Sequence, residues 1–526
     1  MGSGWWVLRV GGRLVLGQTT SHPWHELPTT HHLLPTSHTH CAPRIPDSRL
    51  RTHNLQLLTS SWLRYTSLMA DALHVAVVGT GYVGLTTGVC LAYLGHHVTC
   101  VDKDPEKIAL LKRGKSPIHE QGMEEVMSLA APRLAFAEST AKVVGDADLV
   151  LIAVGTPCKP SGQADNRYVE EAAREIAAGL EPGRSYTLVV KSTVPIGTNR
   201  RVAHVVEQTL ADCGLNGKVK VRVASNPEFL SEGTALQNML YPGRIVIGAD
   251  NPESADILRQ LYRPILEQTF DPPPSLPRPT ASSLPPLVTT DPISAEMIKY
   301  AANAFLSMKI SFINEIASLC EKVGADVTEV ARGIGLDPRI GPRFLQAGLG
   351  WGGSCFPKDT KALHAMGEEL GEPTFLVDAS IAVNQRQRQR AVDRLQDALK
   401  GVRGRVIGVL GLSFKPETDD LRESASLDLI SLLLEREAHV RAHDPVATEQ
   451  ARTLHPDLDI EYCSDPYSLA QGADALVLAT EWREYRHLDL GRLAASMRTP
   501  VLLDGRNVFD PQQARQAGFT YFGVGR

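Results

Sequence analysis

Hydrophobic residues first form a regular pattern at residue 73. Residues 73–79 are a short run rich in β-branched side chains, and residues 85–95 have the small, apolar composition of a helix that ends at Gly95. Residues 97–102 repeat the strand pattern, and further runs typical of buried strands follow at 147–154, 187–192 and 221–224. This alternation of strands and helices predicts a parallel sheet with helices on both faces.

A second α/β unit begins near residue 402. Residues 424–435 have a helical pattern, and strands are predicted at 405–411, 439–444, 473–480 and 500–504. Between the two units, Asp291 and Pro292 are typical of a helix start, and residues 293–323 contain no Gly or Pro. The pattern predicts one long helix that is able to join the two sheet domains and to carry a dimer contact.

Residues 1–68 differ from the rest in composition. They contain seven of the 17 histidines and four of the six tryptophans, and they have no lysine and no persistent periodicity. An organelle transit peptide and a histidine-rich metal-binding segment are two interpretations. We favour a third, a segment outside the working protein produced by a start assigned too far upstream, because Met69 immediately precedes the first clear strand.

Composition then narrows the class of protein. The 526 residues carry a formal net charge of −5, so the chain lacks the basic character of a general nucleic-acid binder. The chain contains no run of about 18 apolar residues, so the sequence predicts no membrane span. The eight cysteines are scattered without a CxxC pair, which predicts reduced thiols in the cytoplasm and no metal site.

The first strand leads into Gly79-Thr-Gly81-Tyr82-Val83-Gly84, which opens the following helix. Asp102 ends the second strand, where a carboxylate binds the adenosine ribose hydroxyls and repels a 2′-phosphate. This context makes the glycine pattern a dinucleotide fingerprint, with the pyrophosphate at the helix N-terminus, and it favours NAD over NADP. The predicted fold is therefore α/β, with two Rossmann-like doubly wound parallel-sheet domains, a long central helix and a disordered N-terminal extension.

This organisation predicts five segments along the chain. They are an unstructured extension or misassigned start (1–70), an NAD-binding Rossmann domain (71–271), a proline-rich insertion (272–290), a central helical and dimerisation domain with the Cys355 loop (291–400) and a second Rossmann-like domain (401–526), to which the family resemblance given below assigns UDP-sugar binding. The insertion contains seven prolines and almost no charge, so we expect it to be extended or disordered at the surface.

Strand ends supply the candidate ligand-binding loops, because doubly wound sheets bind ligands at the carboxyl ends of their strands. In the first domain these loops contain Thr156, Thr193 and residues 228–232. In the second domain, which lacks a GxGxxG pattern, cationic side chains at the strand ends are suited to phosphates: Lys415, Arg422 and Arg506.

Cys355 is the candidate nucleophile. Four glycines precede it within seven residues, and Lys358-Asp359 follow it at the start of a helix expected from Lys358. A buried structural cysteine needs neither the glycines nor the two charges. We expect the helix start and Lys358 to lower the pKa of the thiol.

Together, Gly79-x-Gly81-Tyr82-Val83-Gly84, the segment Pro227–Leu230, the helix with Lys299 and Asn303, and the segment Gly352–Asp359 resemble the UDP-glucose/GDP-mannose dehydrogenase family. The motifs occur in the family's order, and the resemblance extends from about residue 73 to the C-terminus. The family has no counterpart of the segment before Met69. Residues 272–290 are also longer and richer in proline than we expect for the family at this junction.

The resemblance implies two successive NAD-dependent oxidations that convert the C6 alcohol of a nucleotide sugar into a carboxylate. Cys355 would trap the intermediate aldehyde as a thiohemiacetal and then form a thioester that water hydrolyses. The implied catalytic residues are Cys355, Lys299, Asn303, Asp359, Glu228 and Thr156. Lys299 and Asn303 would stabilise an oxyanion from one helix face, and Asp359 would orient or deprotonate water.

By the same resemblance, the NAD contacts are Gly79, Gly81, Tyr82, Val83, Gly84, Asp102, Lys107, Thr156, Thr193, Glu232, Lys358 and Arg422. The implied substrate contacts are Glu228, Phe229, Leu230, Lys299, Asn303, Arg339, Phe344, Gly348, Gly352, Lys415 and Arg506, with Arg339 donated by a dimer partner.

Several alternatives stay open from the sequence. The resemblance favours UDP-glucose as substrate and UDP-glucuronate as product, with GDP-mannose or a UDP-N-acetyl sugar as the alternatives, and the base of each half-reaction is not assigned. A 3-hydroxyacid dehydrogenase would need neither Cys355 nor residues 402–526, and a non-catalytic nucleotide-sugar-binding regulator would not need the full set of reactive residues. A homodimer or a larger homo-oligomer is expected.

Overall fold

The computed structural model describes residues 5–10, 13–18, 72–159, 161–280 and 283–526. The chain divides into two units, residues 1–64 and 65–526. In the first unit, strands β1 (Trp5–Val10) and β2 (Arg13–Gln18) pair as an antiparallel hairpin. These strands were not predicted, although both runs are rich in β-forming residues and flank a Gly-Gly pair. The rest of the predicted N-terminal extension lies outside the described residues.

The first sheet of the second unit has eight strands in the order β10-β9-β8-β7-β6-β3-β4-β5. All neighbours are parallel except β8 and β9. The part from β5 to β8 has the Rossmann strand order, which confirms the predicted fold class. The strands are β3 (His74–Val78), β4 (His97–Val101), β5 (Leu134–Ala137), β6 (Leu149–Ile152), β7 (Ser185–Val190), β8 (Lys220–Ser225), β9 (Ile245–Ala249) and β10 (Leu287–Thr290).

Helices cover both faces of this sheet, so its central strands are apolar along almost their whole length. One hydrophobic core contains side chains of α2, such as Leu85 and Val89, and the other contains side chains of α5, such as Val169 and Ile176. The helices are α2 (Tyr82–Tyr93), α3 (Pro105–Lys112), α4 (Met123–Ala130), α5 (Arg167–Ala178), α6 (Thr198–Asp212), α7 (Ala235–Leu240) and α8 (Pro252–Leu266). Three 3₁₀ turns are η1 (Ala131–Arg133), η2 (Thr140–Lys142) and η3 (Val144–Asp146).

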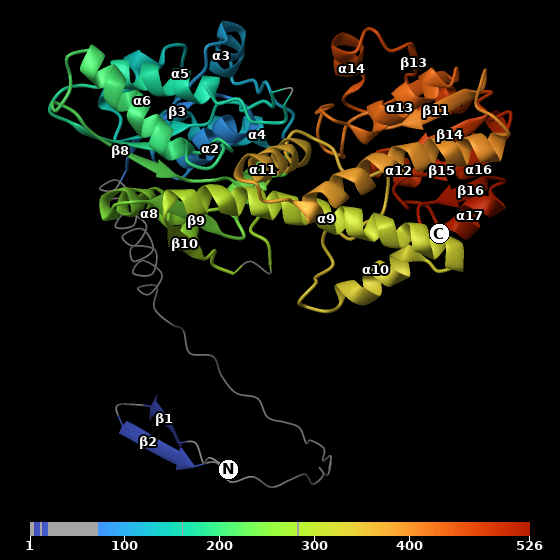
Figure 1. Cartoon of the computed structure of the whole chain (residues 1–526), viewed down its shortest axis with the longest axis horizontal. Helices are drawn as coiled ribbons and strands as arrows, with labels where there is room; N and C mark the ends of the chain where they lie inside the picture. Colours follow the sequence, from blue (N-terminus) through green and yellow to red (C-terminus); the bar gives the residue numbers. More distant parts are fainter. Residues whose placement is uncertain (1–4, 11–12, 19–71, 160, 281–282) are drawn as a thin grey trace, which may run out of the picture. The chain divides into compact units, whose positions relative to one another are not determined.

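The expected long helix is present as α9 (Pro292–Val323), and Asp291 caps it by accepting a hydrogen bond from Ser294 N. Figure 1 shows α9 extending from β9 to the second sheet domain. It packs against β8 and β9 and against three further helices of the central region: α10 (Val327–Gly335), α11 (Phe356–Leu370) and α12 (Phe375–Leu399).

The second sheet has six parallel strands in the order β13-β12-β11-β14-β15-β16, again the Rossmann order. Its strands are β11 (Val406–Leu410), β12 (His439–His443), β13 (Ile460–Tyr462), β14 (Ala475–Leu478), β15 (Val501–Asp504) and β16 (Thr520–Gly523). Its helices are α13 (Ala425–Glu435), α14 (Thr448–Leu454), α15 (Pro466–Ala470), α16 (Leu490–Ser496) and α17 (Pro511–Gln516), with a 3₁₀ turn η4 (Arg483–His487).

The proline-rich segment is more ordered than the sequence indicated. Its last residues form β10, which pairs in parallel with β9 and extends the first sheet by one strand. Prolines 285 and 286 precede this strand, so they remove no donor from its ladder.

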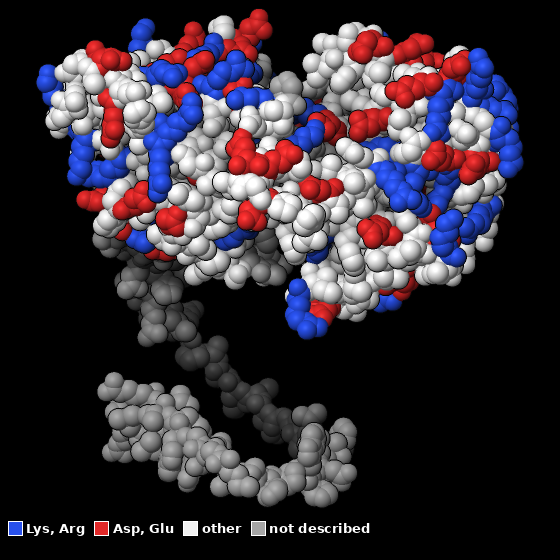
Figure 2. Space-filling model, in the orientation of Figure 1, with Lys and Arg blue, Asp and Glu red and all other residues white. Residues whose placement is uncertain are grey.

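Two surface properties complete the description. Among the described helices, none is both long and apolar enough to cross a membrane. Figure 2 shows acidic and basic side chains intermixed over both sheet domains on the face drawn.

Candidate active site

The glycines of the dinucleotide fingerprint have different surroundings. Gly79 has φ +102°, and a Cβ there would lie 2.6 Å from the Ala153 carbonyl oxygen. A Cβ at Gly84 would lie 1.9 Å from the Gly79 carbonyl oxygen, so this glycine lets α2 approach β3. A Cβ at Gly81 would meet no atom within 4 Å. The open space at the start of α2 is where the fold binds a pyrophosphate, and the residues therefore fit NAD.

Asp102 lies beside this loop at the end of β4. Its carboxylate accepts hydrogen bonds from the backbone and hydroxyl of Thr80, at 2.9 and 2.6 Å. Burial acts to raise the pKa of Asp102, but these hydrogen bonds keep it below its usual value. The side chain is therefore a fixed carboxylate, as ribose recognition requires. Lys107, also predicted to contact NAD, is an exposed residue of α3 near Asp104.

Cys355 is the N-cap residue of α11, which begins at Phe356 rather than at Lys358. The glycines before it allow close packing against the second sheet domain. A Cβ at Gly352 would lie 2.1 Å from the Glu423 carbonyl oxygen, and Gly353 N donates to the Arg422 carbonyl at 3.0 Å. The loop that presents the thiol is thus fixed against the loop that contains Arg422.

The expected origin of thiol activation is corrected by the structure. Burial raises the pKa of the Cys355 thiol, and the cation that opposes this effect is Lys299. Lys358 instead forms an ion pair with Asp359 at 2.5 Å. Sequence proximity suggested Lys358, but the helix directs its ammonium to the neighbouring carboxylate. A thiolate here therefore depends on α9.

Lys299 forms a buried ion pair with Glu228, with 2.7 Å between Nζ and Oε1. Only 3% of Lys299 and 6% of Glu228 are exposed. The other Glu228 oxygen accepts a hydrogen bond from Leu230 N at 2.6 Å. Burial alone would raise the pKa of Glu228, but Lys299 holds it below its usual value. Phe229 stacks under Arg244, whose guanidinium lies 3.6 Å from the ring centroid.

Asn303 lies one turn after Lys299 on α9 and donates to Asp359 Oδ2 at 2.6 Å. Asp359 is fully buried on α11, and Lys358 contacts its other oxygen. These two positions of α9, one helical turn apart, therefore hold two different carboxylates, Glu228 and Asp359. Lys299 also experiences the charges of Cys355 and Asp359, so these groups share one electrostatic environment.

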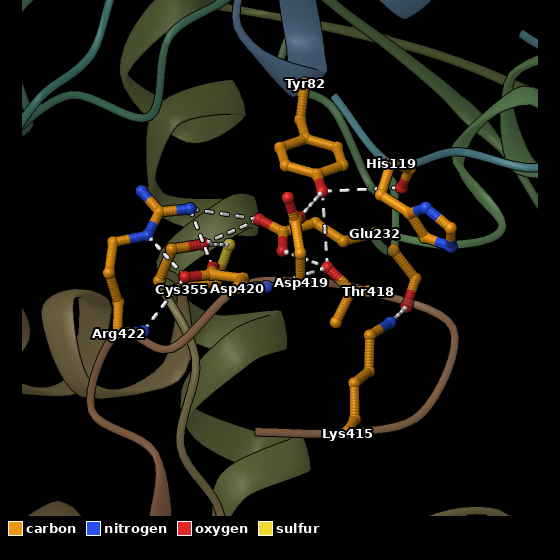
Figure 3. Close-up of polar contacts among 11 residues, drawn as sticks. Tyr82, His119, Glu232, Cys355, Lys415, Thr418, Asp419, Asp420 and Arg422 are labelled. Carbon is orange, nitrogen blue, oxygen red and sulfur yellow. Dashed lines mark hydrogen bonds and ion pairs between the residues drawn. The ribbon is translucent and has the colours of Figure 1, made fainter. Parts of the chain in front are cut away.

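Glu232 lies between Cys355 and the second sheet domain (Figure 3). It accepts a hydrogen bond from Ser354 Oγ at 3.0 Å and forms an ion pair with Arg422 at 3.2 Å. Arg422 also pairs with Asp420 at 2.7 Å. Burial and the nearby Asp420 charge raise the pKa of Glu232 to about 7. This carboxyl group is suited to exchange a proton near neutral pH.

The same loop of the second domain contacts the first domain at two more points (Figure 3). Lys415 Nζ donates to Ser231 Oγ at 2.7 Å. The Tyr82 hydroxyl donates to Asp419 Oδ1 at 3.0 Å and lies 3.2 Å from Thr418 Oγ1. Burial lowers the pKa of Lys415. Two of the three predicted phosphate-binding cations, Lys415 and Arg422, therefore face the predicted NAD domain.

The remaining predicted residues lie at the edges of this region. Thr156 donates to the Thr193 carbonyl at 2.7 Å, which joins the loops after β6 and β7. Phe344 has φ +64° and packs edge-on against Phe356, with 6.2 Å between ring centroids.

Two predicted substrate contacts, Gly348 and Arg506, lie together. A Cβ at Gly348 would lie 2.6 Å from the Gly505 carbonyl oxygen, and Arg506 Nε donates to the Ala479 carbonyl at 2.7 Å. Arg339 is separate from this group. Its side chain is 87% exposed and pairs with Asp337 at 2.6 Å.

Sequence reasoning missed three neighbours of the predicted residues: Ser354, Asp420 and Lys191. Ser354 is adjacent to Cys355, and Asp420 is two residues before Arg422, so proximity to the predicted residues was an available signal. Lys191 precedes Ser192 at the end of β7, and only its burial in the fold distinguishes it from a surface lysine.

Comparison with known proteins shows which family has this domain arrangement. The sequence matches three domains of the UDP-glucose/GDP-mannose dehydrogenase family: the NAD binding domain (residues 73–266), the central domain (293–386) and the UDP binding domain (408–511). A UDP-glucose 6-dehydrogenase of Rhizobium meliloti is 46% identical over 86% of this chain and 100% of its own length. A UDP-glucose 6-dehydrogenase of Pseudomonas aeruginosa is 42% identical over 86% of this chain and 98% of its own length.

Solved structures show the same likeness. A UDP-glucose dehydrogenase from Pyrobaculum islandicum has a TM-score of 0.76 at 42% identity, covering 86% of this chain and 98% of that protein. A UDP-D-ManNAc dehydrogenase from Pyrococcus horikoshii has a TM-score of 0.73 at 26% identity, covering 86% and 99%. The fold, the NAD binding domain and the matched length agree, and this chain belongs to the UDP-glucose/GDP-mannose dehydrogenase family.

Proposed function

We propose that this protein is a UDP-glucose 6-dehydrogenase, which oxidises C6 of UDP-glucose twice with NAD and releases UDP-glucuronate. The observation that carries the proposal is the buried group around the Cys355 loop, in which Lys299 pairs with Glu228 and Asn303 pairs with Asp359. Three relatives named UDP-glucose 6-dehydrogenase align with this chain over almost their whole length. A nucleophile, two cationic or amide donors and two carboxylates are the groups that a four-electron oxidation in one site needs.

NAD, when bound, accepts the hydride removed from C6 in each oxidation. The residues that would hold it are Gly79, Gly81, Tyr82, Val83, Gly84, Asp102, Lys107, Thr156, Thr193, Glu232, Lys358 and Arg422. The open space at Gly81 supports this assignment, since the backbone there is free to contact a pyrophosphate. Arg422 already faces the acidic groups Glu232 and Asp420, so it would exchange one of these partners for a phosphate.

Different residues of the chain would act at different steps of the reaction at C6. Lys299 and Asn303 would donate hydrogen bonds to the oxygen on C6, where negative charge develops. The Cys355 thiolate would add to the aldehyde carbon to form a thiohemiacetal, and the second oxidation would leave a thioester. Asp359, held by Asn303 and Lys358, would orient the water that hydrolyses the thioester. Because the aldehyde stays bound to sulfur, it would not be released.

The sugar nucleotide would be held by Glu228, Phe229, Leu230, Lys299, Asn303, Phe344, Gly348, Gly352, Lys415 and Arg506, with Arg339 reaching a partner subunit's site. Lys415 and Arg506 supply positive charge near strand ends of the domain whose family description is UDP binding. The exposed Arg339 side chain supports a role outside its own subunit.

Stoichiometry tests the proposal. Purified protein is incubated with a limiting amount of UDP-glucose and excess NAD, and NADH is measured by absorbance. Two NADH per sugar support the proposal. One NADH per sugar would exclude the thioester step, and no NADH would favour a nucleotide-sugar-binding regulator. GDP-mannose and a UDP-N-acetyl sugar, assayed in parallel, decide the substrate.

We further propose a homodimer formed through α9. Phe305, Phe312 and Leu319 are spaced by seven residues, lie on one side of the helix and are each more than half exposed. Light scattering of the purified protein tests this. We also place the enzyme in the cytoplasm, because each of the seven described cysteines is a free thiol.

A further inference from the structure

Glu296 is a buried carboxylate that the proposed mechanism does not use. It lies on α9, three residues before Lys299, and only 3% of it is exposed. Its Oε2 accepts a hydrogen bond from Gly197 N at 2.6 Å. Its Oε1 accepts from Asn199 N at 3.0 Å and from Asn199 Nδ2 at 2.7 Å. Burial raises the pKa of Glu296, although these three N–H donors oppose the effect by favouring the ionised form.

The donors belong to the start of α6, so Glu296 caps this helix from another element. Gly197 is the N-cap residue of α6, and it has no side chain that could accept from the first turn. In α8 and α9, by contrast, the N-cap residues Asn251 and Asp291 each accept a hydrogen bond from a backbone N–H of their own first turn. Such a local cap stabilises a helix without joining it to another. The cap of α6 also attaches its N-terminus to α9.

The loop between β7 and α6 continues from this attachment to the predicted NAD contacts. Thr198 N and Oγ1 donate to the Pro195 carbonyl at 3.1 and 2.6 Å, which joins the first turn of α6 to the loop. The Thr193 carbonyl accepts from Thr156 Oγ1 at 2.7 Å on the side of the NAD-binding domain. In the part of the chain that the structure describes, Glu296 is the one side chain of α9 that forms a hydrogen bond with residues 192–199.

Helix α9 has its own fixed position on the first sheet. A Cβ at Gly248 in β9 would lie 2.5 Å from the Ala295 Cβ, so the first turns of α9 pack closely on this strand. Lys299 and Asn303 follow on the same helix and form their contacts with Glu228 and Asp359. Because α9 packs on the sheet independently of Glu296, the Glu296 side chain determines how close the β7–α6 loop lies to this helix.

The strand order shows which end of NAD would meet this loop. Asp102 ends β4, whereas β7 lies on the other side of β3, beyond β6. A dinucleotide whose adenosine ribose binds Asp102 and whose pyrophosphate lies at Gly81 therefore extends its nicotinamide toward the loops after β6 and β7. Thr193 belongs to the second of these loops.

We propose that Glu296 is a positioning residue, which fixes the β7–α6 loop to α9 and thereby sets the nicotinamide end of NAD against the C6 oxygen that Lys299 and Asn303 would hold. The attachment of the loop rests on the contacts above, and its consequence at C6 rests on the proposed function. Hydride transfer depends on this alignment, since a displacement of about 1 Å lowers the rate of a reaction about 100-fold.

Glu296→Gln tests the proposal because it retains the size and shape of the side chain. Its amide oxygen can accept from Asn199, but its amide nitrogen then faces Gly197 N, donor against donor. The matched control is Asn251→Ala, which removes the cap of α8, a helix of the same length in the same domain. Both variants should lower the melting temperature.

Kinetics separate positioning from stability. With enzyme in excess over UDP-glucose and saturating NAD, the first phase of NADH formation is followed by stopped flow. We expect this phase to be at least about tenfold slower in Glu296→Gln and unchanged in Asn251→Ala, with the Kd for UDP-glucose within twofold of wild type in both. With UDP-glucose deuterated at C6, the slower phase of Glu296→Gln should show a primary isotope effect. Amide hydrogen exchange in residues 193–199, measured by mass spectrometry, should be faster in Glu296→Gln alone.

A wild-type first phase in Glu296→Gln, or a slow phase without an isotope effect, would overturn the proposal. An equal loss of rate in Asn251→Ala would also overturn it, since the loss would then follow from stability. If Glu296→Gln does not fold, Glu296→Asp, which keeps the charge but is one methylene shorter, replaces it with the same expected results. If wild type forms no NADH, the proposed function fails, but the exchange measurement still decides whether Glu296 holds the loop, and unchanged exchange would exclude that role.

Discussion

Two glycines of the NAD loop allow binding and folding to be perturbed separately. Gly81 has extended backbone angles (φ −72°, ψ −172°) and open space where a Cβ would project. Gly84 lies three residues later, and its added Cβ would lie 1.9 Å from the Gly79 carbonyl oxygen. We therefore expect Gly81→Ala to impair NAD binding alone and Gly84→Ala to impair folding as well.

The magnitudes follow from these distances. An ordinary contact begins near 3.4 Å, so Gly84→Ala requires a displacement of about 1.5 Å between α2 and the loop before it, and such overpacking costs about 1–3 kcal/mol. In a domain of this size that is a decrease of roughly 2–10 °C in melting temperature. Gly81→Ala should be neutral or stabilising by up to about 1 kcal/mol, because alanine accepts these angles. Its methyl group occupies the expected pyrophosphate position, so the Kd for NAD should rise at least about tenfold.

Differential scanning fluorimetry gives the melting temperatures, and isothermal titration calorimetry gives the Kd for NAD. Each variant serves as the control for the other, since both add one methyl group to the same loop. The reasoning would be refuted if Gly81→Ala bound NAD as wild type does, or if Gly84→Ala kept the wild-type melting temperature.

Three further predictions concern the site and the assembly. Cys355→Ser should abolish complete oxidation, because an alkoxide forms far less readily than a thiolate; wild-type turnover in the NADH assay would exclude Cys355 as nucleophile. Since the pKa of Glu232 is raised to about 7, wild-type stability should fall as the pH rises from about 4.5 to 7, and urea unfolding of Glu232→Gln should lack this component; an equal slope in both proteins would contradict the assignment. Phe312→Glu should convert a dimer to monomers in light scattering, and an unchanged mass would place the interface elsewhere.

The fold was predictable from the sequence wherever a residue type at a given spacing is compatible with only one local structure. Gly79, Gly84 and Asp102 were assigned correct structural positions, because a glycine at a strand-to-helix turn and an acid at the next strand end are required by close packing and ribose recognition. The long helix α9 was expected from its cap and from the absence of breakers. Strands β5, β9, β10, β13 and β16 were not predicted, since short segments of three to five residues depend on pairing with their neighbours.

The electrostatics of the site were less accessible from sequence. Lys358 is near Cys355 in the chain, but the ammonium that lowers the pKa of the thiol belongs to Lys299, more than fifty residues away. Burial, which raises the pKa of both Cys355 and Glu232, cannot be read from a glycine-rich motif. Ion pairs between residues of different helices and strands form only when the chain packs, so the sequence alone does not show them.

The close packing of Gly352 against the Glu423 carbonyl has a consequence for exchange of domains between relatives. The loop that ends at Cys355 belongs to the central region, yet its backbone packs closely against a turn of the C-terminal domain. In a chimaera that takes its C-terminal domain from another relative, this close contact would join the backbones of two different proteins three residues before Cys355. The two regions are therefore expected to be inherited together, and a productive recombination point lies before residue 352 or within a closely matched pair of loops.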